Sequence, residues 1–168
     1  MGGTVYSVAF SPDGKTLILS NAYYRIVRLY SVNGTAITYV SNIYADNYNN
    51  VLTGHGISVA FSPDGNTLVL GGYFTGHAKI YSIQGTTVTY VSDIYADNSN
   101  TAFNNAVQSV SFSPDGKTLV LGGSFIGCAK AYFVNETTVT YVSDIYANKG
   151  ENTLDDYVFS AAFSPNGK

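Results

Sequence analysis

The chain has 168 residues, of which 45 % are hydrophobic, 14 % are aromatic and only 11 % are charged. The formal net charge of −3 and the high aromatic content exclude an intrinsically disordered chain. A pI near 5.1 with eight basic residues excludes an electrostatic nucleic-acid binder. One cysteine excludes an intrachain disulfide, and no apolar run approaches the roughly 20 residues of a membrane-spanning helix, so we expect no membrane partner.

The first 44 residues predict four short β-strands and no helix. The strands are expected at Val5–Ser11, Thr16–Ala22, Ile26–Val32 and Ala36–Tyr44, where β-branched and aromatic residues dominate. Pro12-Asp13-Gly14 separates the first two strands and has the residues of a tight turn. Asn33-Gly34 separates the last two and is the preferred two-residue hairpin turn. No segment has a helical 3.6-residue period.

The pattern then repeats every 51 residues. Ser-Pro-Asp-Gly begins at Ser11, Ser62 and Ser113, and Ser-Pro-Asn-Gly begins at Ser164. Tyr30, Tyr81 and Tyr132 keep the same spacing, as do many other positions. We interpret residues 1–168 as a single domain with repeats at 5–55, 56–106 and 107–157, followed by one extra strand at 158–168.

Four antiparallel strands in each repeat predict an all-β protein built from β-propeller blades. Gly54-His55 and the run from Ser58 to Gly65 resemble the WD-repeat blade, and Val27-Arg28-Leu29-Tyr30-Ser31 resembles that family's Val-Arg-Leu-Trp-Asp. The resemblance implies a propeller that binds proteins. The sequence departs from the family because tyrosine replaces every tryptophan and Gly-His occurs once, so the family's His-Asp-Ser-Trp network is not carried over. Bacterial and phage WD-like propellers are similar in this respect.

A candidate binding surface follows from the differences between the repeats. Strand order places the tight turns at one side of the blades and the longer connections at the other. The copies share the turns and differ in the connections, where aromatic residues and arginine gather as they do in protein interfaces. The candidate partner-binding residues on this side are Tyr24, Arg25, Tyr48, His55, Tyr73, His77, Phe103 and Tyr157.

Catalytic, cofactor and metal sites are not expected. His77 aligns with Ile26 and Cys128, so the blade does not require histidine there, and no spacing supplies further metal ligands. Asp13 and its copies are interpreted as turn residues, because a calcium site needs six to eight oxygen ligands. No phosphate-binding loop or nucleophile motif is present.

Three blades do not close a propeller ring, which needs about four to eight. We therefore expect either identical copies that form a homo-oligomer or a longer propeller chain, and the mid-hairpin end favours the longer chain. The leading function is a non-enzymatic scaffold that binds a protein partner through the long connections. The alternatives are a structural repeat that assembles into a particle, surface layer or filament, and an enzyme or sugar binder at the channel mouth. The first residues do not have the pattern of a signal peptide, and only the composition favours an extracellular or particle-surface setting.

Overall fold

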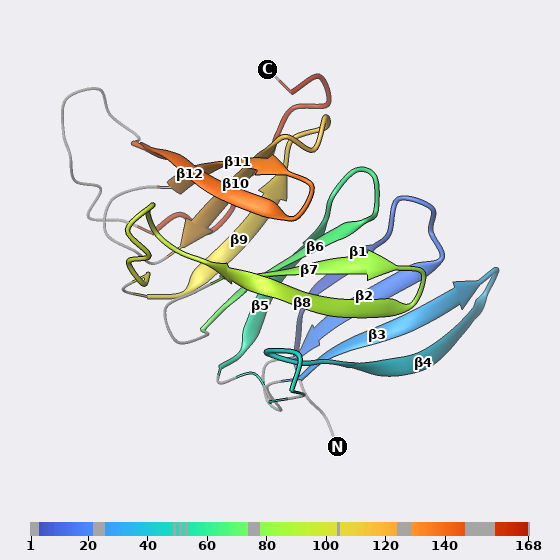
Figure 1. Ribbon diagram of the computed structural model, residues 1–168. Coiled ribbons are helices and arrows are strands. Elements are labelled where there is room, and N and C mark those ends of the chain that lie inside the picture. The colour runs from blue at the N-terminus through green and yellow to red at the C-terminus, as the bar shows by residue number, and fades with distance from the viewer. Residues whose placement is uncertain are drawn as a thin grey trace.

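The computed structural model describes residues 4–21, 26–48, 50, 52, 54–73, 78–103, 105–123, 129–146 and 157–167. These residues form three antiparallel sheets of four strands each, which follow one another in chain order (Figure 1). The strands are β1 Val5–Phe10, β2 Thr16–Asn21, β3 Ile26–Asn33, β4 Ala36–Ile43, β5 Gly56–Phe61, β6 Thr67–Gly72, β7 Ala78–Gln84, β8 Thr87–Ile94, β9 Val107–Phe112, β10 Thr118–Gly123, β11 Ala129–Asn135 and β12 Thr138–Ile145. The described part of the chain contains no helix that is long and apolar enough to cross a membrane.

Each sheet is a propeller blade, as the sequence predicts. The strand orders are β1-β2-β3-β4, β5-β6-β7-β8 and β9-β10-β11-β12, so neighbours in sequence are neighbours in the sheet. The predicted strands of the first blade are confirmed to within one residue. Ser11 falls outside β1 because its side chain begins the turn: its hydroxyl donates to Asp13 Oδ1 at 2.6 Å and accepts from the Thr16 amide at 2.9 Å.

The tight turns have the same structure in every repeat. Gly14, Gly65, Gly116 and Gly167 all have φ between +69° and +76°, the left-handed region that glycine adopts without strain. The aspartate before each of the first three glycines accepts the serine hydroxyl at 2.5–2.6 Å. The interpretation of these aspartates as turn residues is thereby supported, since each carboxylate is engaged within its own turn.

The core lies between the blades. We call the surface of a blade that faces the following repeat its front face, and the surface that faces the preceding repeat its back face. The front face of the first blade and the back face of the second form one cluster, including Ile18, Leu29, Leu70 and Tyr81. An equivalent cluster joins the second and third blades. Apolar burial between blades is therefore the main stabilising term, because the sheets share no strands.

Polar contacts align the blades along the inner strands. The Val59 amide donates to Ser7 Oγ at 3.3 Å, and the Val110 amide donates to Ser58 Oγ at 3.1 Å. In both bonds the hydroxyl lies on the inner strand of one blade and the amide lies on the inner strand of the next. The bond fixes how far one inner strand is displaced along its neighbour, and hence the register between blades.

The predicted extra strand lies on the front face of the third blade. The Ala161 amide donates to Ser109 Oγ at 2.9 Å, and the Val158 amide donates to the Gly123 carbonyl at 3.0 Å. Residues 157–167 thus take the place that β5 takes on the first blade and β9 takes on the second. They are not part of a sheet, because no described strand pairs with them.

Candidate partner-binding surface

The connection between the first two blades presents a tyrosine on a rigid loop. Asp46 Oδ1 accepts the amides of Tyr48 and Asn50 at 2.9 and 3.2 Å, and the Ala45 amide donates to the Asn50 carbonyl at 2.8 Å. These bonds join Ala45 and Asp46 to Asn50, and Tyr48, which lies between them in sequence, is 88 % exposed. The side-chain hydrogen bond from Asn50 is the main cause that lowers the pKa of Asp46.

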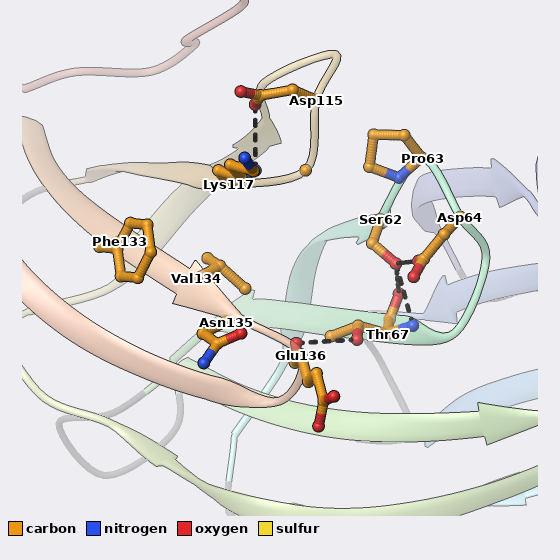
Figure 2. A pocket seen from close by; sticks show the side chains of 11 residues that line it. Ser62, Pro63, Asp64, Thr67, Asp115, Lys117, Phe133, Val134, Asn135 and Glu136 are labelled. Carbon is orange, nitrogen blue, oxygen red and sulfur yellow. Dashed lines mark hydrogen bonds between the residues drawn. The ribbon is translucent and has the colours of Figure 1, made fainter.

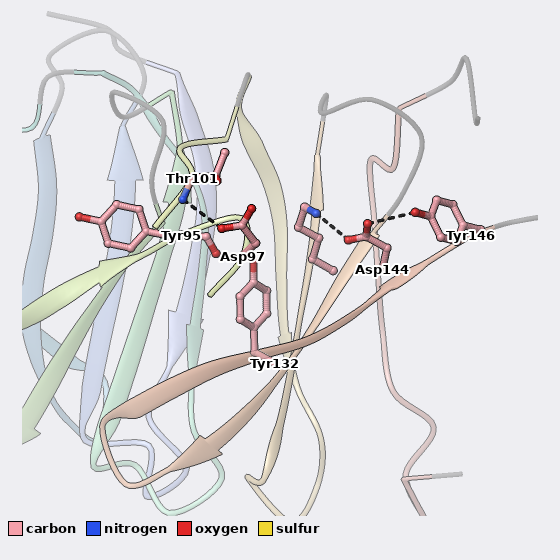
Figure 3. Close-up of polar contacts among 7 residues, drawn as sticks. Tyr95, Asp97, Thr101, Tyr132, Asp144 and Tyr146 are labelled. Carbon is pink, nitrogen blue, oxygen red and sulfur yellow. Dashed lines mark hydrogen bonds and ion pairs between the residues drawn. The ribbon is translucent and has the colours of Figure 1, made fainter. Parts of the chain in front are cut away.

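The next connection repeats this loop (Figure 3). Asp97 accepts the amides of Ser99 and Thr101 at 2.8 and 3.1 Å, and Thr101 also lowers the pKa of this carboxyl group through its side chain. The tip position is Ser99 here, so the blade architecture does not require the tyrosine at 48. An aspartate at the start of the connection is therefore the structural element, and the tip residue is the variable one.

A cleft of about 320 Å³ lies beside this second connection, between the second and third blades. Tyr132 donates its hydroxyl to the Tyr95 carbonyl at 2.8 Å and holds the connection against the third blade (Figure 3). Lys130 Nζ lies 2.6 Å from Asp144 Oδ1 and 5.3 Å from the centre of the Tyr141 ring. Burial alone would raise the pKa of Asp144, but the hydrogen bond and charge of Lys130 lower it.

The same contacts occur one repeat earlier. Tyr81 donates to the Tyr44 carbonyl at 2.9 Å, and Lys79 Nζ lies 2.6 Å from Asp93 Oδ1. Burial, with the nearby Tyr90 and acidic groups, raises the pKa of Tyr81 above its usual range, so its phenol stays protonated as a donor. Because the polar groups bond one another in both repeats, we interpret them as supports for the loops.

Three of the predicted site residues lie exposed at the connection side. They are Tyr48, Tyr73 and Tyr157, which have about half or more of their surface exposed. His55 is partly buried at the entry to β5, and its carbonyl accepts the Tyr73 amide at 2.9 Å, so these two residues are neighbours. Its buried Nδ1 has no hydrogen-bond partner among the described residues. Tyr24, Arg25 and His77 lie outside the described residues.

Phe103 does not belong to the surface. Its side chain is 4 % exposed and packs in the cluster between the second and third blades. The sequence carries a signal for this burial, because residue 103 aligns with Leu52 and Leu154. Leu52 is buried in the equivalent cluster. A position that is apolar in all three copies is a core position, and the comparison of repeats at 52, 103 and 154 identifies it.

Hollows on the opposite, tight-turn side arise from the repeat itself. One of about 720 Å³ lies between the second and third blades and includes Asp64, Asp115 and Glu136 in its lining (Figure 2). Another of about 480 Å³ lies at the equivalent place between the first two blades. The Asp115 carboxylate accepts the Lys117 amide at 3.0 Å within its own turn, as Figure 2 shows. The hollows recur because each is lined by the tight turns of two adjacent blades and by the outer hairpin turn of the later blade.

The first two repeats match a family of known proteins. The family described as "WD domain, G-beta repeat" matches residues 2–31 and 47–82. The match spans β1 to β3 of the first blade and β5 to β7 of the second, so it confirms the resemblance to WD-repeat blades for these two repeats. No curated protein matches the chain.

Solved propellers share the fold at low sequence identity. A 6-phosphogluconolactonase candidate from Bacteroides uniformis is 19 % identical, with a TM-score of 0.72 over 99 % of this chain and 46 % of its own. U3-55K is 17 % identical, with a TM-score of 0.72 over 96 % of this chain and 42 % of its own. The periplasmic gluconolactonase PpgL of Pseudomonas aeruginosa is 17 % identical, with a TM-score of 0.68 over 89 % and 42 %. The chain spans less than half the length of each.

Proposed function

We propose that this chain is a non-enzymatic interaction module that binds a protein partner through the connection side of its blades. The observation that carries the proposal is the exposure of Tyr48, Tyr73 and Tyr157 at positions that the blade architecture does not constrain. The aligned residues are Ser99 and Gly150 for Tyr48, Ala22 and Ser124 for Tyr73, and Thr4, His55 and Ala106 for Tyr157. An exposed tyrosine that is not needed for packing is a residue type that protein interfaces select.

The loop geometry adds to this proposal. The Asp46 turn holds the backbone of Tyr48 in place, so little conformational entropy is lost when its ring is buried against a partner. Tyr73 is tied through its amide to His55 in the same way. Rigid presentation of an aromatic ring raises affinity by reducing the cost of ordering, rather than by adding contacts.

Photo-crosslinking from single positions tests the binding side. A photoreactive amino acid placed at Tyr48 or Tyr73 is expected to capture a partner that the same group at Lys15 or Lys117, on the tight-turn side, does not capture. The double variant Tyr48→Ser and Tyr73→Ala should lose that partner while its unfolding transition is unchanged. Capture from the tight-turn positions, or binding that survives the double variant, would contradict the proposal.

The similarity to lactonases bears on the fold and not on the activity. The periplasmic gluconolactonase PpgL is only 17 % identical to this chain, a similarity that indicates a shared fold alone. Among the described residues no group of three His, Cys, Asp or Glu side chains is arranged to hold a metal ion. We expect no lactone hydrolysis above the spontaneous rate, measured with gluconolactone and 6-phosphogluconolactone, and a rate that scales with protein concentration would overturn this expectation.

A further inference from the structure

The back face of the first blade carries the residues of a blade interface without a neighbour. Val8 is 53 % exposed, whereas Val59, at the same position of the second blade, is 7 % exposed. Phe10 and Tyr39 on the same face are also about half exposed, and their counterparts Phe61 and Tyr90 pack in the cluster between the blades. An apolar surface of this kind is a binding surface by default, because monomeric proteins rarely leave one open.

The front face of the third blade is open in the complementary way. Ile145 is 44 % exposed, whereas Ile94, at the same position of the second blade, is 3 % exposed. This face has the residues that cover a back face elsewhere in the molecule. The first and third blades therefore carry the two halves of an interface that is already formed twice within the chain.

The first blade also lacks a hydrogen bond and a close contact that the second blade makes with the blade before it. A Cβ atom added to Gly65, in the second blade, would lie 3.3 Å from Pro12 of the first blade. A Cβ atom added to Gly14, the equivalent residue of the first blade, would have nothing within 4 Å. The Tyr81 hydroxyl donates to a carbonyl of the first blade, whereas no described residue accepts from its counterpart Tyr30. Gly14 and Tyr30 of the first blade could therefore make the same contacts if another blade packed on the back face.

Two inner strands compete for one place. β1 pairs with β2 in a ladder from Val5 to Phe10, but none of the described strands is an inner strand beside its back face. Residues 157–167 have such a place on the third blade but no ladder. Eight of the twelve residues 157–168 are identical to those at 4–15, so β1 fits where the C-terminal segment lies.

We propose that two copies of this chain associate head to tail, with the back face of the first blade of one copy packed on the front face of the third blade of the other. In the monomer, residues 157–167 occupy the site of the incoming inner strand, and they leave it when the second copy binds. The segment is displaced and β1 is not, because no described strand pairs with the segment, whereas β1 has the full ladder with β2.

The association strengthens packing without a net loss of inner-strand contacts. The segment gives up its place on the third blade, and β1 of the second copy takes that place while it keeps its ladder. The outer strands of the first blade then gain a neighbour, since Tyr39 of one copy comes to lie over the front face that contains Ile145. The apolar surface that this removes from water is the driving term.

Sedimentation velocity of the full chain across a wide concentration range tests the proposal with three variants. Val8→Asp places a charge at the centre of the proposed interface and should weaken self-association at least about tenfold. Ala161→Pro removes the amide that bonds Ser109 Oγ, so it should loosen the segment and strengthen self-association several-fold. Val91→Asp is the matched control, an exposed valine in β8 away from both end faces, and should change nothing.

The test is decisive because Val8→Asp and Ala161→Pro should change the strength of self-association in opposite directions. Val8 is already half exposed in the monomer, so its aspartate variant should keep the wild-type unfolding transition. Weaker association in Ala161→Pro would show that the segment is part of the interface and would overturn its displacement. A wild-type chain that remains a 17.9 kDa monomer at every concentration, together with a monomeric Ala161→Pro variant, would overturn the association itself.

Discussion

The first and second blades share almost the same residues but bury them very differently. Tyr30 and Tyr81 occupy equivalent positions and contact equivalent rings, at centroid distances of 5.9 Å to Tyr39 and 5.8 Å to Tyr90. Tyr81 is fully buried because the first blade covers it, whereas Tyr30 is only partly buried because no described blade covers it. The burial of a residue in this protein is a property of the neighbouring blade, and the repeat sequence alone does not determine it.

The charged groups also differ between the first and second blades. Lys79 in the second blade is held between the Tyr90 ring and Asp93, and it adds to the lowering of the Asp46 pKa from the preceding connection. Arg28 stands at that position in the first blade, is exposed, and pairs across the strands with Asn42 instead of an aspartate. The second blade therefore has an aspartate, Asp93, beside its partly buried lysine, whereas the first blade has Asn42 at that position.

The largest effect should come from removing the covered tyrosine. Tyr81→Ala deletes a buried ring and the bond to the Tyr44 carbonyl, so it should lower the free energy of unfolding by about 3–5 kcal/mol. Tyr30→Ala, the matched variant in the uncovered blade, should cost less than half of that. Urea denaturation measures both, and equal losses would show that the two blades are covered to the same extent.

A smaller effect is expected where β6 of the second blade approaches β9, the inner strand of the third blade. A Cβ on Gly71 would lie 2.8 Å from Val107 Cγ1 and 2.9 Å from the Val107 carbonyl oxygen. The first blade has Ser20 at the position of Gly71, and the residue aligned with Val107 is Gly56. Gly71→Ser should therefore cost about 1–3 kcal/mol, as overpacked sites do.

The compensating change provides the control for this prediction. Val107→Gly in the Gly71→Ser background recreates the residue pair of the first interface, so part of the loss should be recovered. Losses that simply add in the double variant would mean that residues 71 and 107 do not contact each other in solution.

Acid should destabilise the fold through the tight turns. The serine hydroxyl in each turn is the main cause that lowers the pKa of Asp13, Asp64 and Asp115 below the ordinary value of 3.8. The unfolded chain therefore binds protons at a higher pH than the folded chain, so this stabilisation is complete above about pH 4 and is lost as the pH falls through the folded values. Thermal melting between pH 5 and pH 3 measures the loss.

The variant Asp64→Asn reduces this pH dependence. The turn at Ser164 already uses Asn166, whose Oδ1 accepts the serine hydroxyl at 2.8 Å, so asparagine is compatible with the geometry. The melting temperature of the variant should fall less between pH 5 and pH 3 than that of the wild type. A parallel fall in both proteins would indicate that other groups control the acid transition.

The smallest effect is expected on the tight-turn side. Lys15→Ala and Lys117→Ala remove exposed side chains and leave in place the backbone amides that donate to Asp13 and Asp115. The free energy of unfolding and any partner binding should change by less than about 0.5 kcal/mol. A tenfold loss of partner binding in either variant would move the binding surface to this side.

Much of the fold could be predicted from the sequence, because each strand is bounded by turn residues with defined backbone conformations. Gly14 and Gly34 have positive φ, as the turn patterns require, and Glu136 adopts φ +55° at the position of Gly34. The exposed tyrosine at position 48 could be predicted from its absence in the other copies. The sequence prediction places Phe103 on the surface, but the structure buries it, as the apolar residues Leu52 and Leu154 at the aligned positions indicate.

What lies on each end face could not be predicted in the same way. Val8 and Val59 occupy equivalent places in nearly identical strands, so no local pattern distinguishes the exposed valine from the buried one. The difference depends on contacts between residues about 50 positions apart, such as the bond from the Val59 amide to Ser7 Oγ. Only the arrangement of whole blades shows which copy of a residue is covered.

Amide hydrogen exchange of the two inner strands tests most directly whether coverage by a neighbouring blade controls each repeat. At the lowest concentration, where the mass is that of the monomer, the amides of β1 (Val5–Phe10) should exchange much faster than those of β5 (Gly56–Phe61). Protection of β1 should then rise with concentration as its back face is covered. Equal protection of the two strands in the monomer would contradict the account.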